Sequence, residues 1–268
     1  MNMWYNVCSK RSVLLLAINS VYLGNCLDIM QAIDDQSINM ILADLPYGTT
    51  ECSWDIVIPL DLLWNQYKRI IKQNGAILLF GSEPFSSHLR MSNIEMYKYD
   101  WIWVKSSPFG YLEAKNKPMK KHEIISVFSF GKSSNGCKNR ITYNPQGLVQ
   151  INKKRKNSTN NVQGERKSRE IGSEFIQKNT NYPTSVLFFD SEKKEIHPTQ
   201  KPVSLFEYLI KTYTNEGELV LDNVAGSGTT GIACINTNRN FILIEKDERY
   251  FDIINERISN HKLQLKMF

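Results

Sequence analysis

The chain has 268 residues, of which 41% are hydrophobic, and its 33 Lys and Arg against 27 Asp and Glu give a net charge of +6. This length accommodates one large α/β domain or one domain with an insertion, and the moderate positive charge is compatible with a nucleic-acid partner. The five scattered cysteines form no C-x-x-C pair, which excludes a disulfide framework and a zinc knuckle, and no apolar run reaches transmembrane length, so we expect a soluble cytoplasmic protein without a bound metal or a membrane partner.

The first half of the chain predicts strands that alternate with helices. One or two short strands precede a helix from about Leu27, and the apolar run at 38–43 predicts a buried strand that ends just before Asp44. Hydrophobic residues at helical spacing predict a helix over 59–75, which Asn74 and Gly75 would end. The other predicted elements of this half are strands at 76–80, 99–104 and 123–130 and a helix near 83–93.

A polar segment then interrupts the pattern. From Lys132 to about Pro183 the chain is rich in Asn, Lys, Ser and Gly, and residues 152–170 contain seven basic side chains against two acidic ones. No apolar periodicity is present there. This composition is typical of a solvated surface loop, but an inserted segment that binds a polyanion has the same signature, and the composition alone leaves both interpretations open.

Regular structure is predicted again in the last third of the chain. The predicted elements are a strand at 185–190, a helix at 203–214, strands at 217–222 and 240–245, and an amphipathic helix at 247–261. Strands that alternate with helices predict a doubly wound α/β sheet, in which ligands bind above the carboxyl ends of the strands. We therefore expect Asp44 at the ligand-binding edge of the sheet.

A glycine-rich turn lies between the last two predicted strands. "GSGTTG" at 226–231, the glycine turn, follows a strand and opens a helix, and Glu245 ends the next strand about 20 residues on, which is the context of a nucleoside-cofactor site. The acidic side chain can accept hydrogen bonds from ribose hydroxyls. Asp222 stands directly before the turn, placed to meet a positive amino group. The turn alone does not decide which cofactor binds, and an ordinary strand–helix turn is the alternative.

Several motifs in a fixed order resemble one enzyme family. "DLPY" at 44–47 looks like the D-P-P-Y catalytic motif of the DNA methyltransferases that modify amino groups. "DNVAGSGTT" at 222–230 resembles their cofactor motif, D-P-F-x-G-S-G-T-T, and "HPTQKP" at 197–202 matches the segment that precedes it. "LGNC" at 23–26 resembles the family's G-D-C segment. The catalytic motif precedes the cofactor motif, as in the β group of this family.

The resemblance implies a fold, a cofactor and a partner. It implies a Rossmann-like methyltransferase sheet built from residues 1–131, the catalytic half, and 185–268, the cofactor-binding half, with 132–184 as an inserted basic target-recognition region. It implies S-adenosyl-L-methionine as the methyl donor and double-stranded DNA as the partner, in a prokaryotic or phage-encoded restriction–modification system. Whether a partner restriction endonuclease exists, and the oligomeric state, stay open.

The resemblance also implies roles for single residues. Asp44 and the carbonyl of Leu45 would accept the amine hydrogens of a base flipped out of the duplex, Pro46 would stiffen the corner, and Tyr47 would stack on the base. The methyl group would then transfer directly, in line, without a covalent enzyme intermediate. The residues implied at the cofactor are Asn25, Cys26, Asp44, His197, Lys201, Asp222, Val224, Gly226, Gly228, Thr229 and Glu245. Adenine N6 is favoured as the target, since the family's cytosine-N4 enzymes often carry Ser where Asp44 stands.

Other interpretations and departures accompany this one. Leu45, Asn223 and Val224 replace a Pro, a Pro and a Phe of the family motifs, which motivates the alternative of a catalytically decayed module that still binds DNA. Cytosine N4 is a second alternative, and an NAD-dependent oxidoreductase built on the glycine turn is a third, although it leaves "DLPY" and "HPTQKP" unexplained. The expected phosphate contacts in the basic segment are Lys153, Lys154, Arg155, Lys156, Arg166, Lys167 and Arg169.

Overall fold

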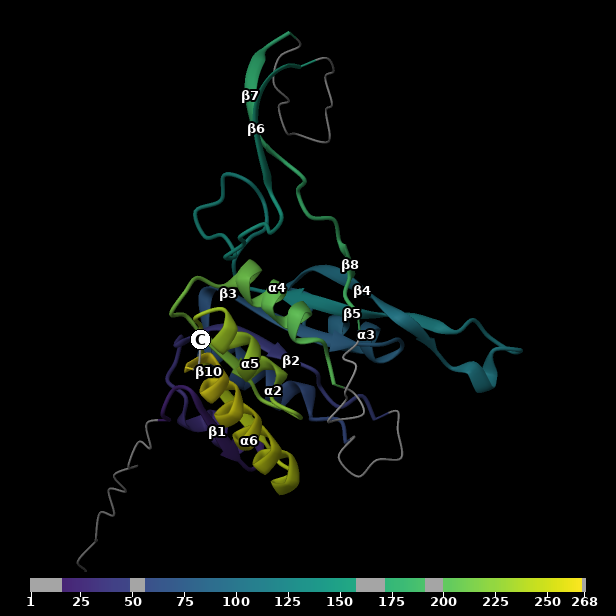
Figure 1. Cartoon of the computed structure of the whole chain (residues 1–268), viewed down its shortest axis with the longest axis vertical. Helices are drawn as coiled ribbons and strands as arrows, with labels where there is room; N and C mark the ends of the chain where they lie inside the picture. Colours follow the sequence, from purple (N-terminus) through teal and green to yellow (C-terminus); the bar gives the residue numbers. More distant parts are fainter. Residues whose placement is uncertain (1–15, 49–55, 158–171, 191–199, 267–268) are drawn as a thin grey trace, which may run out of the picture.

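An eight-stranded mixed sheet forms the centre of the computed structural model, which describes residues 16–48, 56–157, 172–190 and 200–266 (Figure 1). Its strands are β1 (Ser20–Leu23), β2 (Ile38–Ala43), β3 (Ile71–Gly81), β4 (Tyr97–Phe109), β5 (Lys120–Phe128), β8 (Val186–Phe188), β9 (Leu219–Asp222) and β10 (Asn240–Glu245). The order across the sheet is β1-β10-β9-β2-β3-β5-β4-β8. The strands from β1 to β3 in that order are parallel, whereas β5 runs antiparallel to both β3 and β4.

Helices cover both faces of this sheet. α1 (Cys26–Ile29), the 3-10 turn η1 (Met30–Ala32), α2 (Leu60–Ile70) and α3 (Phe85–Ser92) pack on one face, and α4 (Val203–Tyr213), α5 (Thr229–Asn236) and α6 (Glu248–Lys266) pack on the other. Strand β2 shows why the sequence demands two layers of helices. All six of its residues are buried; Met40 and Leu42 pack with α4 and α5, while Ile41 and Ala43 pack with α1 and α2. The doubly wound α/β prediction is confirmed, with β5 as an antiparallel addition.

The centre of the sheet joins distant parts of the chain. β2 pairs with β3 on one side and with β9 on the other, so the strand that ends before Asp44 lies beside the strand that ends at Asp222. Parallel strands end at the same edge of a sheet. The segment that follows β2 and the glycine turn that follows β9 therefore meet at one edge.

The predicted helix over 59–75 is wrong at its C-terminal end. α2 ends at Ile70 and β3 begins at Ile71, so Gly75 lies within a strand. A Cβ atom on Gly75 would lie 2.8 Å from the carbonyl oxygen of Asn39 in the neighbouring strand. The glycine thus allows two strands to approach each other and does not end a helix.

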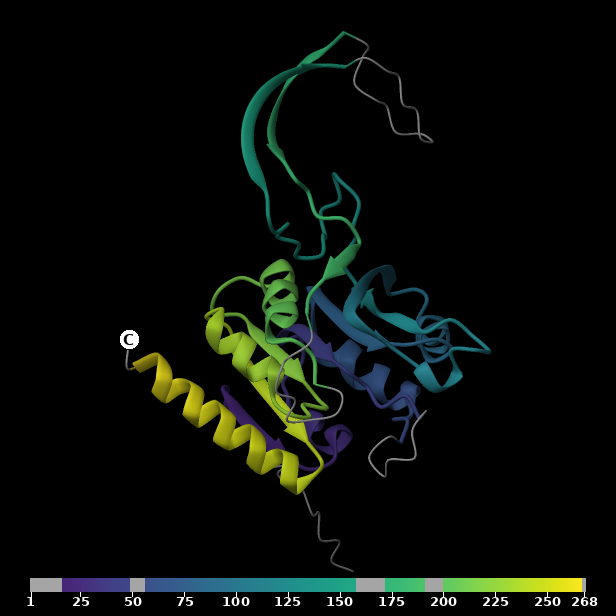
Figure 2. The same cartoon turned by 45° about the vertical axis from the view of Figure 1, so that its right-hand side comes forward.

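A two-stranded arm projects from the body of the molecule. β6 (Val149–Lys156) and β7 (Glu174–Thr180) form an antiparallel pair separate from the main sheet (Figures 1 and 2). The sequence analysis predicted no strand in this region, because the side chains of β6 are nearly all exposed and carry no apolar alternation. The 3-10 turn η2 (Tyr111–Glu113) connects β4 and β5 at the tip of a second projection, which these two paired strands form (Figure 1).

Two observations bear on the wider environment. Among the described residues, no helix combines the length and apolar character needed to cross a membrane. The same residues contain no group of three or more His, Cys, Asp or Glu that could hold a metal ion.

Candidate active site

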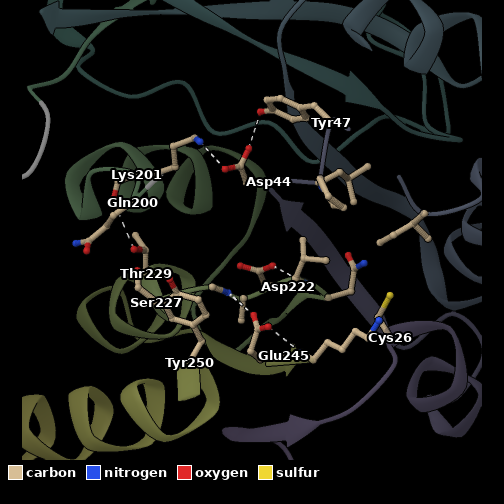
Figure 3. Close-up of a pocket in the computed structure, with 18 of the residues that line it drawn as sticks. Cys26, Asp44, Tyr47, Gln200, Lys201, Asp222, Ser227, Thr229, Glu245 and Tyr250 are labelled. Atoms are coloured by element: carbon tan, nitrogen blue, oxygen red, sulfur yellow. Dashed lines mark hydrogen bonds and ion pairs between the residues drawn. The ribbon is translucent and has the colours of Figure 1, made fainter. Parts of the chain in front are cut away.

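A cavity of about 700 Å³ lies at the edge of the sheet where the parallel strands end. Its wall combines the residues after β2, the glycine turn after β9 and the end of β10 (Figure 3). Residues near the start of β5 also line it. Five carboxylates line it, those of Asp44, Glu123, Asp222, Glu245 and Asp247, together with the ammonium groups of Lys105, Lys120, Lys201 and Lys246. The wall of the cavity is therefore rich in both acidic and basic side chains.

Asp44 lies at the mouth of β2 with both carboxylate oxygens engaged. The Tyr47 hydroxyl donates to Asp44 Oδ1 over 2.6 Å, and the Lys201 ammonium lies 2.5 Å from Asp44 Oδ2. The Tyr47 ring stacks on Phe85, with ring centroids 5.0 Å apart and an interplanar angle of 29°. Leu45, which follows Asp44 in the chain, is buried and packs in the hydrophobic core, so it anchors the corner. The corner thus presents one acceptor group and one aromatic ring to the cavity in fixed positions.

Lys201 belongs to a four-membered charge cluster. Its ammonium lies 3.3 Å from Glu123 Oε2, and the other oxygen of Glu123 pairs with the Lys105 ammonium. Burial alone would lower the pKa of Lys201, but the charges of Asp44 and Glu123 outweigh burial and raise it above its ordinary value. Burial would likewise raise the pKa of Glu123, and the two lysines lower it instead. Lys201 and Glu123 are therefore charged at neutral pH.

The direction of β5 explains how this cluster forms. β4 is parallel to β2 in the sheet, so Lys105, near its end, reaches the same edge as Asp44. β5 runs the opposite way, which brings Glu123, near its start, to that edge as well. Lys201 immediately precedes α4 and enters from the helical layer.

Asp222 is a buried carboxylate at the end of β9. Its oxygens accept hydrogen bonds from the Val224 N–H, at 3.1 Å, and from the Thr230 hydroxyl. Burial raises the pKa of Asp222 to about 7, and the neighbouring charges of Glu245 and Asp44 add to that effect. Clustered acids with raised pKa values are a frequent property of functional sites.

Glu245, at the end of β10, fixes the glycine turn through hydrogen bonds. Its Oε2 accepts from the Gly226 N–H at 2.7 Å, while its Oε1 accepts from the N–H groups of Lys246 and Asp247. Burial raises the pKa of Glu245. Gly226 and Gly228 have φ angles of +55° and +77°, a backbone region that other residues rarely adopt. The sequence motif G-x-G here serves the shape of the turn itself.

The structure brings together most of the residues predicted at the site. The cavity is lined by Asn25, Cys26, Asp44, Leu45, Pro46, Tyr47, Lys201, Asp222, Val224, Gly226, Thr229 and Glu245. Gly228 lies behind the wall as the N-cap of α5, and His197 lies outside the described residues. The side chain of Asn25 accepts a hydrogen bond from the Leu27 N–H and so caps α1, a local role that the sequence analysis did not assign.

The basic residues predicted to bind phosphates lie elsewhere. Lys153, Lys154, Arg155 and Lys156 are exposed on β6 and are not among the residues that line the cavity. The arm that carries them projects from the body of the molecule (Figure 1). Arg166, Lys167 and Arg169 lie outside the described residues. The arm thus presents a row of positive side chains on a projecting pair of strands.

The sequence analysis missed several residues of the site. Lys105 and Glu123 were not predicted, although each is a charged side chain directly beside a mostly apolar run, 101–104 and 124–128 respectively. Asn223 was noted only as a departure. In the structure its Oδ1 accepts a hydrogen bond from the buried Tyr67 hydroxyl at 2.6 Å, so the side chain is tied into the core behind the cavity.

Comparisons with known proteins give a consistent result. A family model described as DNA methylase, N6_N4_Mtase, matches residues 38–256, which include Asp44 and the glycine turn. The Type II methyltransferase M.HpaI of Haemophilus parainfluenzae is 25% identical over 250 residues, covering 88% of this chain and 73% of the relative. The Type II methyltransferase M.HinfI of Haemophilus influenzae is 28% identical over 283 residues, covering 91% of this chain and 69% of the relative.

Solved structures share the fold. The M1.HpyAVI–SAM complex superposes with a TM-score of 0.59 and 24% identity, covering 89% of this chain and 98% of that chain. The cytosine-N4-specific PvuII DNA methyltransferase superposes with a TM-score of 0.63 and 14% identity, covering 90% of each chain. At these identities the superpositions speak to the architecture of the sheet and its helices.

Proposed function

The chain belongs to the N6/N4 DNA methylase family, and from this premise we propose that it methylates N6 of adenine within a specific sequence of double-stranded DNA. The methyl donor is S-adenosyl-L-methionine. The observation that carries the proposal is the meeting of Asp44 and the glycine turn on one cavity. The relatives are named Type II methyltransferases, which supports a role in a bacterial restriction–modification system in the cytoplasm.

The acids of the cavity suit this cofactor. S-adenosyl-L-methionine carries an ammonium and a sulfonium and no phosphate, so it favours acidic neighbours. Asp222 is 4% exposed and its carboxylate lies near two other acids, an arrangement that a cation would relieve. Asp222 would pair with the ammonium group of the cofactor, and Glu245 would accept hydrogen bonds from its ribose hydroxyls. Asn25, Cys26, Val224, Gly226 and Thr229 would complete its walls. The cofactor supplies an electrophilic methyl group.

The corner after β2 suits an amine substrate. The nitrogen of an exocyclic amine is a poor nucleophile, because its lone pair is delocalised into the ring. Asp44 and the backbone carbonyl of Leu45 accept its two hydrogens, which frees the lone pair, and Pro46 keeps the carbonyl in place. Tyr47 offers its ring to the base. A base reaches this buried corner only when it is flipped out of the duplex.

The arm carries side chains that could contact the DNA backbone outside the cavity. Lys153 to Lys156 of β6 are exposed and positive, and phosphate contacts of this kind position a protein on a duplex without reading its sequence. Residues 132–184 would then act as the target-recognition region, between the catalytic half and the cofactor-binding half of one domain.

Direct sequencing of modified bases tests the proposal. Genomic DNA from a host that expresses the protein should contain N6-methyladenine at one short motif, and Asp44→Ala should remove the modification while S-adenosyl-L-methionine still binds in calorimetry. Asp35→Asn is the matched control, because Asp35 pairs with Arg69 near the opposite edge of the sheet. Full methylation by Asp44→Ala would refute the role of Asp44.

The same experiment separates the alternatives. N4-methylcytosine in place of N6-methyladenine would assign the enzyme to cytosine, an activity that the name of the PvuII neighbour specifies for that protein. Unmodified DNA, no cofactor binding and retained DNA affinity would assign a decayed module. The Tyr67–Asn223 hydrogen bond speaks against decay at one of the departures, because it gives Asn223 a defined structural place.

A further inference from the structure

We propose that the Lys201 ammonium binds the ring nitrogen beside the amino-bearing carbon of the target base, and that Glu123, fixed by Lys105, positions it. The inference rests on the proposed function only in requiring an amino-bearing base, and it applies equally to adenine and cytosine. It assigns to Lys201 a contact with the substrate, whereas the family resemblance implied a place at the cofactor.

The first step is the match between two pairs of atoms. The pairing edge of adenine presents an N–H donor on N6 and, one carbon away, the acceptor N1; cytosine presents the same pair as N4 and N3. Asp44 Oδ2 and Lys201 Nζ are an acceptor and a donor 2.5 Å apart, and both residues line the cavity. The protein pair is therefore complementary to the edge of the base, and flipped bases are commonly read at this edge.

The second step is the discrimination that follows. Guanine and thymine carry a carbonyl oxygen in place of the amino group and an N–H in place of the ring acceptor. Against these bases Asp44 would face an oxygen and Lys201 would face a donor, so both contacts would be repulsive. Unpaired polar groups in a buried site penalise a mismatched substrate strongly. One ion pair thus accepts two bases and rejects the other two.

The third step is the role of Glu123. Once the base amine donates to Asp44, the buried ammonium needs another anion beside it. Glu123 Oε2 lies 3.3 Å from Lys201 Nζ and, apart from this ion pair, has no hydrogen-bond partner among the described residues, although the Glu123 side chain is only 12% exposed. Its other oxygen is held by Lys105. Glu123 is therefore a fixed carboxylate whose second oxygen can accept a stronger hydrogen bond from Lys201.

The fourth step is the balance of charge. Asp44 and Glu123 contribute two negative charges, and Lys105 and Lys201 contribute two positive ones. The Lys201 side chain is 7% exposed, and its pKa is raised by the two acids, so it remains a charged donor at neutral pH. A neutral base adds no charge to this balanced set, so the cluster keeps its balance of charge when its hydrogen bonds are exchanged.

The test removes one atom from the substrate. Two otherwise identical duplexes carry the mapped target base or its analogue with CH in place of the ring nitrogen, 1-deazaadenine or, if cytosine is the target, 3-deazacytosine. DNA affinity with S-adenosyl-L-homocysteine and kcat/KM for methyl transfer are measured for each. The wild-type protein should lose about tenfold or more on the analogue, as expected for a hydrogen bond to a charged group.

The variants decide who makes the contact. Lys201→Met should bind and methylate the natural and the analogue duplex equally well. Glu123→Gln keeps the volume of the side chain and leaves the Lys201–Asp44 ion pair in place, and it should show a smaller preference for the natural duplex than the wild-type protein. Lys72→Met, at the opposite edge beside Asn39, should keep the wild-type preference. The analogue also changes duplex stability, but that effect is common to all variants and cancels in the ratio.

The outcomes are distinct. Equal use of both duplexes by the wild-type protein, or an unchanged preference in both Lys201→Met and Glu123→Gln, would overturn the inference while methylation of the natural duplex left the proposed function standing. Absence of methylation and of DNA binding in the wild-type protein would overturn both. If Lys201→Met fails to fold, Glu123→Gln still decides.

Discussion

The replacement Asp222→Asn should stabilise the ligand-free protein at pH 8 and weaken its binding of S-adenosyl-L-methionine. Asp222 is buried, and its oxygens accept from the Val224 N–H and the Thr230 hydroxyl. An Asn side chain keeps an acceptor for the first contact, and the threonine hydroxyl can rotate to accept from the new amide. The substitution therefore removes a charge with little change of shape.

The magnitude follows from the pKa of Asp222, which burial raises from 3.8 to about 7. The folded pKa lies above the unfolded one, so the contribution of this carboxyl to stability is greatest at low pH and is lost as the pH rises from about 4 to 7. At about 1.4 kcal/mol per pKa unit, ionised Asp222 lowers the free energy of unfolding by roughly 4 kcal/mol at pH 8. Asn should recover an amount of that order.

Urea denaturation at pH 8 and pH 5 measures the difference in the free energy of unfolding between Asp222→Asn and the wild-type protein. This difference at pH 5 should be less than half its value at pH 8, because the wild-type side chain is then protonated in the folded protein. Calorimetry should show cofactor affinity falling about tenfold from pH 8 to pH 6 in the wild-type protein and remaining flat in the variant. Asp35→Asn, on an exposed carboxylate, is the control. An Asp222→Asn protein that is less stable at both pH values, or that binds the cofactor as tightly as the wild type, would refute the reasoning.

Other predictions concern the turn, the arm and the catalytic corner. A Cβ atom on Gly228 would lie 2.8 Å from an isoleucine of α6 at φ +77°, so Gly228→Ala should lower the free energy of unfolding by about 1–3 kcal/mol, and by more than Gly110→Ala, whose Cβ meets open space; equal losses in denaturation would contradict this. Removing Lys153 and Lys154 should weaken specific and non-specific DNA binding alike and reduce the slope of log K against log salt by up to about 2, measured by anisotropy; an unchanged slope would show that the arm does not touch phosphates. Tyr47→Phe keeps the ring but removes the hydrogen bond to the Asp44 carboxylate, which we propose to be catalytic, so kcat should fall about tenfold with unchanged cofactor affinity; unaltered turnover would show that this bond is dispensable.

The parts of the fold that the sequence predicted are those with a strong local signal. The run 38–43 matched β2 at both ends, because a strand buried on both faces is apolar at nearly every position, here all but Asn39, and a carboxylate follows it. The glycine turn was found because its φ angles demand glycine at fixed spacing. Where two apolar elements adjoin, as α2 and β3 do, the apolar pattern continues from the helix into the strand, and the predicted boundary was therefore misplaced.

The rest depends on contacts between distant residues. Lys201 and Asp44 are 157 positions apart, and although the motif resemblance placed both at the cofactor, it implied no ion pair between them. Glu123 reaches the site only because β5 runs antiparallel, a choice that short apolar segments do not reveal. The arm was missed for a different reason: its strands are solvated, and a solvated pair of strands has no hydrophobic period to detect.

The place of β2 between β3 and β9 has a consequence for biosynthesis. A ribosome makes β9 more than 170 residues after β2, so the nascent sheet carries an unpaired edge at β2 until β9 has been synthesised. During that interval the open edge can recruit a strand from another polypeptide. A message truncated before residue 219 would yield a product with neither a finished sheet nor a methyl-donor pocket, and quality control rather than residual activity would decide its fate.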